Sequence, residues 1–273
     1  MPPAPEVASG GGPSSGPAAG AIAAARRVAA GAVYEAGTIA GRWPRVALPA
    51  ARLLGHGEPL DGRTQLVVEG YPRSSNTLAV ALIAAAQPGG VRIAHHIHAP
   101  AHVLEAVRRG LPVLVLIRAP AEAAVELVLT KPALSLRQAL RGWLRFYGPL
   151  LPHRSSFVVA RSDEIPDALP DVVERLNARF GLSLRPPGAD EARAAEAAMG
   201  AYWEGRSGPG LPLVGRTRAP DDTAGDAAQD RRGRLRRGYA APSLRALRER
   251  AERLHRTFTD TPADLGGSAQ GHG

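Results

Sequence analysis

The chain has no cysteine, one lysine and few aromatic residues, which account for 4% of the sequence. Without thiols, its 273 residues can form no disulfide framework, no thiolate metal site and no cysteine nucleophile. Such a composition is compatible with a reducing compartment, and we expect the protein to be cytoplasmic.

Long apolar runs are also missing. The segment from Ala21 to Leu54 is rich in alanine, but charged residues interrupt it, among them Arg26, Arg27, Glu35, Arg42 and Arg45. A membrane-spanning helix needs about 18 or more consecutive apolar residues. A signal peptide places its basic residues before the apolar core, whereas here a polar segment comes first. We therefore predict a helical arm over residues 21–63 that packs on the domain, with peripheral contact to a membrane surface as the alternative.

The two ends of the chain differ in composition from the rest. Residues 1–20 consist of Pro, Gly, Ser and Ala with few other residues and one charge. Such a segment cannot bury enough apolar surface to become ordered. We predict disordered tails at 1–20 and 261–273, which leaves residues 64–260 for one domain, a length sufficient for a hydrophobic core.

The formal net charge is +9, and arginine supplies almost all of it because Lys131 is the only lysine. This balance favours partners of negative charge: a phosphorylated cofactor, an anionic glycan, a membrane surface or a nucleic acid.

Apolar runs and helical patterns alternate through the domain. Short apolar runs at 66–69, 91–94, 112–117 and 157–160 are typical of strands. Helical patterns follow them at 76–86, 100–109, 120–129, 136–150 and 166–180. This alternation predicts a three-layer α/β fold with a central parallel sheet and helices on both faces.

Polar residues follow each predicted strand: the segment 73–77, the histidines of 95–98, Arg118, and Arg161 with Asp163. The carboxyl ends of parallel strands lie at one edge of a sheet, where ligands bind in open α/β folds. We therefore expect these groups to converge.

The segment from Gly70 to Thr77 joins a predicted strand to a predicted helix. Such a loop directs backbone amides and the positive end of a helix dipole at one point, which suits phosphate or sulfate. The segment was compared with the nucleoside-triphosphate pattern G-x-x-x-x-G-K-S/T. Gly70 and Thr77 match the first and last positions, but Ser75 replaces the second glycine and Asn76 replaces the lysine. An ordinary strand-to-helix turn is the alternative interpretation.

Two segments resemble the sulfotransferases that use 3′-phosphoadenosine 5′-phosphosulfate (PAPS). The run Y-P-R-S-S-N-T at residues 71–77 resembles the 5′-phosphosulfate loop, Y-P-K/R-S-G-x-T. The strand ending in Arg118-Ala119-Pro120 resembles the R-x-P segment that binds the 3′-phosphate. A serine follows that arginine by eight residues in the family, where this chain has Glu126. A carboxylate about 4 Å from a phosphate costs a few kcal/mol at an effective dielectric near 20.

The resemblance implies a P-loop fold and transfer of a sulfuryl group from PAPS to a hydroxyl or amine. The acceptor would be a small molecule or a glycan, the other product adenosine 3′,5′-bisphosphate, and no metal would be needed. Arg73 would stabilise charge on the phosphosulfate. The other residues implied in donor binding are Ser74, Ser75, Asn76, Thr77, Arg118, Glu126 and Arg232, the last by a loose alignment.

Four histidines lie between positions 95 and 102. In cytosolic sulfotransferases a histidine of an H-x-P segment is the general base, and His98-Ala99-Pro100 matches this pattern. The resemblance thus assigns the base to His98, with His96 as second choice. Zinc is the competing interpretation, but the chain has neither an H-E-x-x-H pattern nor cysteine, so we predict no metal site.

The C-terminal region is rich in arginine. Its few aromatic residues, Tyr239 and Phe258, argue against a nucleic-acid surface. An apolar face formed by Leu244, Leu247, Ala251 and Leu254 predicts a helix packed on the domain. A P-loop kinase or nucleotidase and a degenerate, non-catalytic nucleotide-binding protein are the alternative functions. Neither the acceptor nor the oligomeric state is indicated.

Overall fold

The computed structural model describes residues 17–165, 167–191, 193–195 and 225–260. Within them the chain forms a mixed α/β fold around a parallel sheet of four strands: β1 (Leu66–Gly70), β2 (Ile93–His95), β3 (Val113–Ile117) and β4 (Val158–Arg161). The α/β class, the parallel sheet and its four strands are confirmed. Most of the two predicted tails lies outside the described residues.

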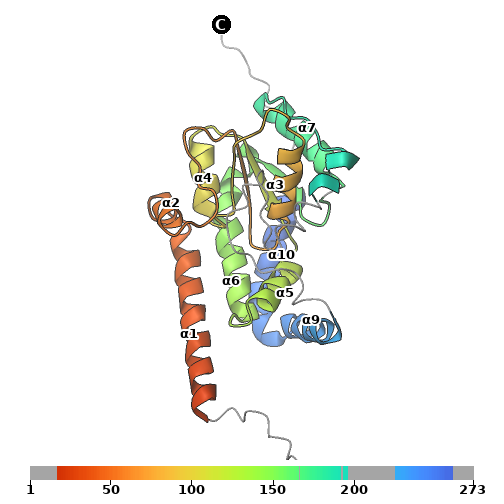
Figure 1. The fold of residues 1–273 in the computed structure, drawn as a ribbon. Helices are drawn as coiled ribbons and strands as arrows, with labels where there is room; N and C mark the ends of the chain where they lie inside the picture. The colour runs from red at the N-terminus through yellow and green to blue at the C-terminus, as the bar shows by residue number, and fades with distance from the viewer. Residues whose placement is uncertain (1–16, 166, 192, 196–224, 261–273) are drawn as a thin grey trace, which may run out of the picture.

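Helices cover both faces of the sheet (Figure 1). One face packs against α3 (Asn76–Ala85) and α7 (Leu169–Phe180). The other packs against α4 (Pro100–Arg108), α5 (Pro120–Thr130) and α6 (Leu136–Tyr147). Successive side chains of a strand point to opposite faces, so Leu114 and Leu116 enter the first core while Val113 and Val115 enter the second. All five residues of β3 are buried, as in parallel sheets covered on both sides.

Some helix boundaries differ from those predicted. The helix expected over 136–150 ends at Tyr147, and a 3-10 segment (Gly148–Ser156) follows that carries two prolines. Proline lacks a backbone N–H and disfavours helical geometry in the residue before it, so an α-helix does not continue through this stretch. Similarly, α7 begins at Leu169 rather than at 166.

The C-terminal helices are α9 (Asp226–Tyr239) and α10 (Arg245–Asp260), joined through a short 3-10 turn (Pro242–Leu244). The predicted apolar face is confirmed: Leu244 and Ala251 are buried, and Leu247 and Leu254 pack against the same core. This packing holds the arginine-rich helices beside α5 and α6.

The N-terminal arm consists of α1 (Pro17–Ala40) and α2 (Pro44–Leu53). Its first helix begins at Pro17, inside the range whose composition predicts a tail. Glu35 of α1 forms an ion pair with Arg145 of α6, and Arg145 also donates to the Thr38 hydroxyl at 2.9 Å. Gly142 of α6 leaves space for the Tyr34 ring, which a Cβ atom there would overlap. No described helix is both long and apolar enough to cross a membrane.

The strand order β2-β1-β3-β4 creates a topological switch point. From β1 the chain moves to one side to form β2, then returns past β1 to form β3 and β4 on the other side. Connections on opposite faces diverge here, and the carboxyl ends of β1 and β3 flank the crevice that open α/β sheets use for ligands. The predicted anion-binding loop of residues 71–77, called the anion loop below, follows β1, and Arg118 follows β3.

Candidate functional site

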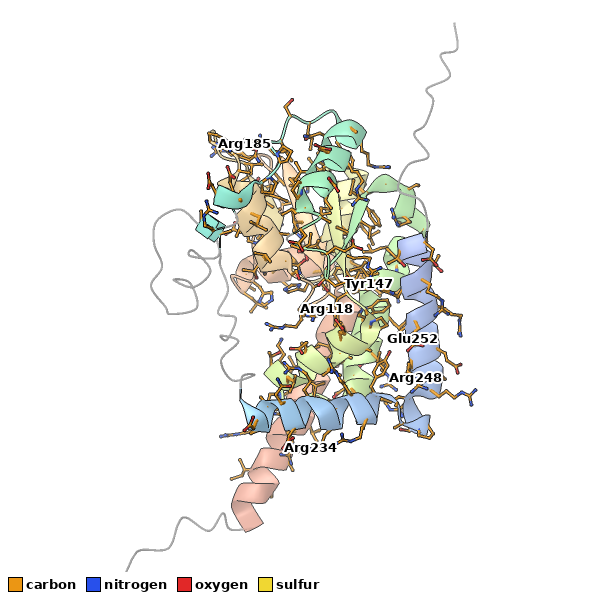
Figure 2. The ribbon with its side chains drawn as sticks, turned by 90° about the vertical axis from the view of Figure 1, so that its right-hand side faces the viewer. Arg118, Tyr147, Arg185, Arg234, Arg248 and Glu252 are labelled. Atoms are coloured by element: carbon orange, nitrogen blue, oxygen red, sulfur yellow. The ribbon has the colours of Figure 1, made fainter. Side chains whose placement is uncertain are left out.

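Two arginines meet at the switch point. The Arg118 Nη1 atom donates a hydrogen bond to the Arg73 carbonyl at 2.9 Å, and the Trp143 indole donates to the Arg118 carbonyl at 3.1 Å. Arg118 lies near the middle of the molecule in Figure 2. The expectation that the loops after β1 and β3 converge is therefore fulfilled for these two residues.

The Arg73 guanidinium is partly buried and donates to no described residue, and its Nε atom is fully enclosed. Burial lowers the pKa of Arg73, the Glu126 carboxylate opposes this change, and Arg118 adds to it. A guanidinium nonetheless keeps its proton in proteins. The site thus contains a desolvated cation whose hydrogen-bond donors are available to an anion.

The start of α3 adds backbone donors. The Ala79 amide is bonded to the Ser75 carbonyl at 3.0 Å, whereas the amides of Asn76, Thr77 and Leu78 have no acceptor among the described residues. No side chain caps this helix. Free amides and the positive end of the helix dipole are the features with which α-helices bind phosphate.

The side chains of the loop bond mainly within the protein. Ser74 is fully buried, and Ser75 Oγ donates to the Ser162 carbonyl at 3.0 Å. The Asn76 side chain donates through Nδ2 to the Gly70 carbonyl at 3.2 Å, and the Thr77 hydroxyl lies 2.9 Å from the His96 ring. The groups left for a ligand are thus the amides and the Arg73 guanidinium, since Arg118 already donates through Nη1 to the Arg73 carbonyl and through Nε to Glu122 at 3.3 Å. Direct ligand contact by these four side chains stays a prediction.

Backbone strain is concentrated in the same region. Four described non-glycine residues have positive φ angles: Arg73 (72°), Ser75 (60°), His96 (62°) and His98 (53°). Each such backbone conformation costs roughly 1–3 kcal/mol of folding free energy. It persists only where the surrounding structure enforces it, commonly at active sites and ligand-binding loops. Ser75 occupies the position of a family glycine and adopts the conformation that glycine would adopt freely.

Tyr147 holds the loop against the sheet. Its hydroxyl donates to the Leu116 carbonyl of β3 at 2.7 Å and accepts from the Tyr71 amide at 3.2 Å. Burial raises the pKa of Tyr147 above its usual range, so the phenol stays protonated. The hydroxyl therefore links β3 to the first residue of the anion loop.

Glu69, at the end of β1, is a fully buried carboxylate. Oε1 accepts from the Ile97 amide at 2.7 Å and from His102 Nδ1 at 2.8 Å. Oε2 accepts from the amides of Gly70 at 3.3 Å and His98 at 3.2 Å. Burial alone would raise the pKa of Glu69, but these donors, led by His102, outweigh it and lower the pKa to about 2. The ionised carboxylate thus fixes the histidine-containing loop after β2.

His98 has a defined tautomer. Its Nδ1 atom lies 2.8 Å from the Gly70 carbonyl, which can only accept, so Nδ1 carries the proton. The lone pair is then on Nε2, which has no described partner. Burial lowers the pKa of His98, which keeps the ring neutral. The side chain is 19% exposed, so a neutral imidazole with a free acceptor nitrogen remains within reach of solvent.

His96 lies beside His98 but uses both ring nitrogens. Nε2 is 2.9 Å from the Thr77 hydroxyl, and Nδ1 is 2.7 Å from Nδ1 of His95. Burial lowers the pKa of His96 to about 3, with the neighbouring His98 adding to the effect. This neutral ring supports the loop and has less freedom than His98 to accept a proton.

Glu126 is paired with Arg232, so the carboxylate that departs from the family pattern is not isolated. The Arg232 Nε atom donates to Glu126 Oε1 at 2.9 Å, and the two side chains are 19% and 15% exposed. Glu126 also acts electrostatically on Arg73. The structure therefore brings Arg73, Arg118, Glu126 and Arg232 into one group.

Arg161 and Asp163 form an exposed pair with each other at 2.7 Å after β4. Among the described residues, no three or more His, Asp or Glu side chains are arranged to hold a metal ion.

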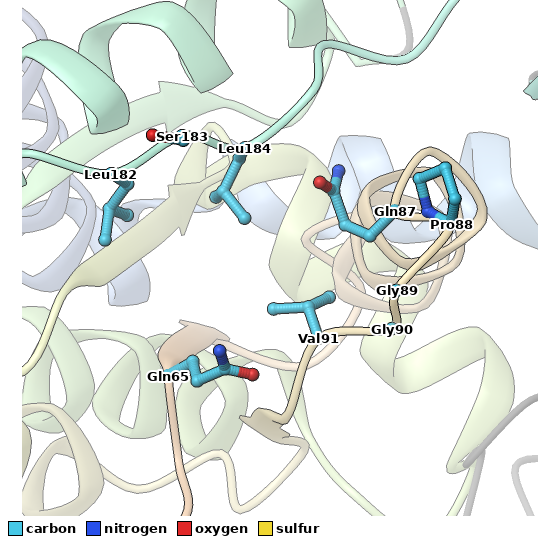
Figure 3. A pocket seen from close by; sticks show the side chains of 9 residues that line it. All are labelled: Gln65, Gln87, Pro88, Gly89, Gly90, Val91, Leu182, Ser183 and Leu184. Atoms are coloured by element: carbon cyan, nitrogen blue, oxygen red, sulfur yellow. The ribbon is translucent and has the colours of Figure 1, made fainter.

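A cavity of about 360 Å³ lies at the opposite edge of the sheet (Figure 3). Gln65 and Val91, which precede β1 and β2, contribute to its lining, together with Gln87 and Leu184. This amino-terminal edge is remote from the loops that follow the strands. The cavity is therefore separate from the candidate site.

The sequence analysis missed three supporting residues: Glu69, Tyr147 and Ser162. A signal existed for Glu69, because an acidic residue inside an apolar strand needs a partner when buried. Tyr147 belongs to a visible aromatic stripe, but the partners of its hydroxyl depend on the tertiary fold. Nothing in the sequence distinguishes Ser162 from other serines.

Neither a protein-family model nor a curated protein matches this chain.

Proposed function

We propose that the chain is a PAPS-dependent sulfotransferase that transfers a sulfuryl group to the hydroxyl or amine of a small-molecule or glycan acceptor. The main support is the partly buried Arg73 guanidinium, which donates to no described residue and lies beside Arg118 at the start of an uncapped helix. A desolvated cation surrounded by unused donors suits a phosphosulfate group.

In this proposal each group of residues has a separate role. The amides at the start of α3 and the Arg73 guanidinium bind the 5′-phosphosulfate and stabilise negative charge as the bond to sulfur breaks. Arg118 and Arg232 hold the 3′-phosphate. His98 Nε2 removes the proton from the hydroxyl or amine of the substrate that receives the sulfuryl group, while the Gly70 carbonyl keeps the ring oriented. Bound PAPS would supply the electrophilic sulfuryl group.

Calorimetry on the full chain tests the donor site. We expect adenosine 3′,5′-bisphosphate to bind more tightly than ATP with magnesium, because its ribose carries two separate phosphates, one for Arg73 and the amides and one for Arg118 and Arg232. Replacing Arg73 by Gln should weaken binding about 10- to 100-fold, the value of a charge-assisted hydrogen bond or two. The matched control is Arg92→Gln, since Arg92 precedes β2 at the other sheet edge and pairs with Glu58 and Asp61. The Arg92→Gln variant should bind adenosine 3′,5′-bisphosphate with the affinity of the wild type.

Turnover is tested with radiolabelled PAPS and a panel of hydroxyl and amine acceptors. Labelled product that depends on Arg73 supports the proposal. Preference for ATP with magnesium would instead indicate a kinase or nucleotidase. Tight binding of the bisphosphate without transfer to any acceptor class would favour a non-catalytic nucleotide-binding protein.

A further inference from the structure

Exposed apolar side chains gather on the N-terminal arm. Eight large apolar side chains are exposed among the described residues, and all eight lie between positions 22 and 54. Leu53 and Leu54 are 87% and 77% exposed, Val28 and Val33 are 74% and 73% exposed, and Trp43 is 49% exposed. Single exposed apolar residues are normal on proteins, but their confinement to one element marks an interaction surface.

These side chains lie away from the surface by which the arm packs on the domain. In α1, Tyr34 and Thr38 share the face toward the domain: the Tyr34 hydroxyl bonds to the Tyr71 hydroxyl, and the Thr38 hydroxyl accepts from Arg145 of α6. Val28, Val33 and Ile39 lie outside that face and are exposed. Figure 1 shows α1 along one flank, with no described helix on its outer side.

The exposed, unpaired charges of the arm are all positive. Four exposed arginines, Arg26, Arg27, Arg42 and Arg45, form no ion pair with any residue that the structure describes. The single acidic residue from 17 to 54 is Glu35, whose carboxylate is used by α6. The outer surface of the arm is therefore apolar and basic.

We propose that this surface docks on an anionic lipid bilayer, with Trp43, Leu53 and Leu54 entering the interface and the arginines contacting lipid headgroups. Amphipathic helices with a basic border bind bilayers in this way, and tryptophan prefers the headgroup level. The Arg42 guanidinium lies 5.3 Å from the centre of the Trp43 ring, so charge and apolar surface share one location. A second copy of the chain fits less well, because it would bring unpaired arginines against unpaired arginines.

Co-sedimentation of the full chain with vesicles tests the proposal. We expect binding to vesicles of phosphatidylcholine mixed with phosphatidylglycerol, little binding to phosphatidylcholine alone, and weakening with added salt. Arg42→Gln with Arg45→Gln should weaken binding about thirtyfold, at roughly fivefold for each arginine near an anionic surface. Leu53→Ser with Leu54→Ser should weaken it at least about tenfold. All four side chains are exposed, so these variants should fold.

The matched control removes the same charge elsewhere. Arg234 and Arg236 of α9 are exposed, and Arg234→Gln with Arg236→Gln should leave vesicle binding unchanged. An equal loss in this control would overturn the proposal, as would equal affinity for neutral vesicles or no vesicle binding at all. A concentration-dependent dimer in light scattering, abolished by the Leu53 and Leu54 substitutions without vesicle binding, would assign the surface to self-association and also overturn it.

Discussion

Replacement of Glu126 by Ser should tighten the binding of adenosine 3′,5′-bisphosphate. Glu126 lies where the sulfotransferase pattern has serine, and its carboxylate binds the Arg232 guanidinium at 2.9 Å. A bound 3′-phosphate would compete with this carboxylate for Arg232 and would be repelled by its charge. Serine removes both effects and leaves a hydroxyl donor.

The expected size follows from Coulomb's law. Two unit charges about 8 Å apart repel by about 2 kcal/mol at an effective dielectric near 20. Arg232 offsets part of this repulsion, and both side chains keep some exposure to water. A net gain of about 1–2 kcal/mol remains, which is a 5- to 30-fold decrease in Kd. Glu126→Gln should give most of the same gain, because it removes the charge at nearly constant shape.

Calorimetry with two nucleotides separates this mechanism from general effects. AMP lacks the 3′-phosphate, so its affinity should be the same in the wild type and in Glu126→Ser. The matched control is Glu105→Ser. Glu105 is 11% exposed and also pairs with arginines, but it lies near the end of α4, at the other edge of the sheet. Weaker bisphosphate binding in Glu126→Ser would refute the reasoning and would show that Glu126 orients Arg232 toward the ligand.

Two further changes probe the buried network. His98→Asn keeps a donor for the Gly70 carbonyl but removes the basic nitrogen. The kcat value should therefore fall about 10²- to 10⁴-fold, while the affinity for adenosine 3′,5′-bisphosphate stays unchanged. The control His153→Asn, at an exposed position, should change neither value. Burial lowers the pKa of His98, so the wild-type rate should fall with acid only below pH 6.5; a fall beginning above pH 7 would exclude His98 as the base. Glu69→Gln should cost on the order of 3 kcal/mol of unfolding free energy in urea at pH 7, because the pKa drops from 4.5 to about 2 on folding. Since the folded-state pKa is the lower one, this difference should shrink as the pH falls from 4.5 toward 2, and a difference independent of pH would contradict the assignment.

Much of the architecture could be predicted from local patterns. The apolar runs of β1 and β3 are bounded by Gly70 and by the proline-containing turn after Arg118, so the strands and their carboxyl ends are visible in the sequence. Parallel pairing then requires those ends to share an edge, whatever the strand order. This rule places Arg73 and Arg118 at one edge, and their contact follows because β1 pairs directly with β3.

The remaining features depend on contacts between distant segments. Glu126 and Arg232 are 106 positions apart, and their pairing follows from how α9 lies on α5. No local pattern in the sequence links these two residues, so the pairing could not be predicted. Likewise, the conformations of His96 and His98 depend on donors reaching back to Glu69, which no periodicity encodes.

Contacts from α1, α6 and β3 fix the loop of residues 71–77. The Tyr71 hydroxyl donates to the Ala139 carbonyl of α6 at 2.8 Å, so it accepts the 2.6 Å hydrogen bond from the Tyr34 hydroxyl of α1. The Tyr71 amide is held by Tyr147, which is anchored to β3. Positive φ angles at Arg73 and Ser75 persist because these contacts leave the loop no relaxed alternative. If an anion binds here as we propose, it meets donors that these contacts already orient, and charge stabilisation would need little reorganisation of the protein.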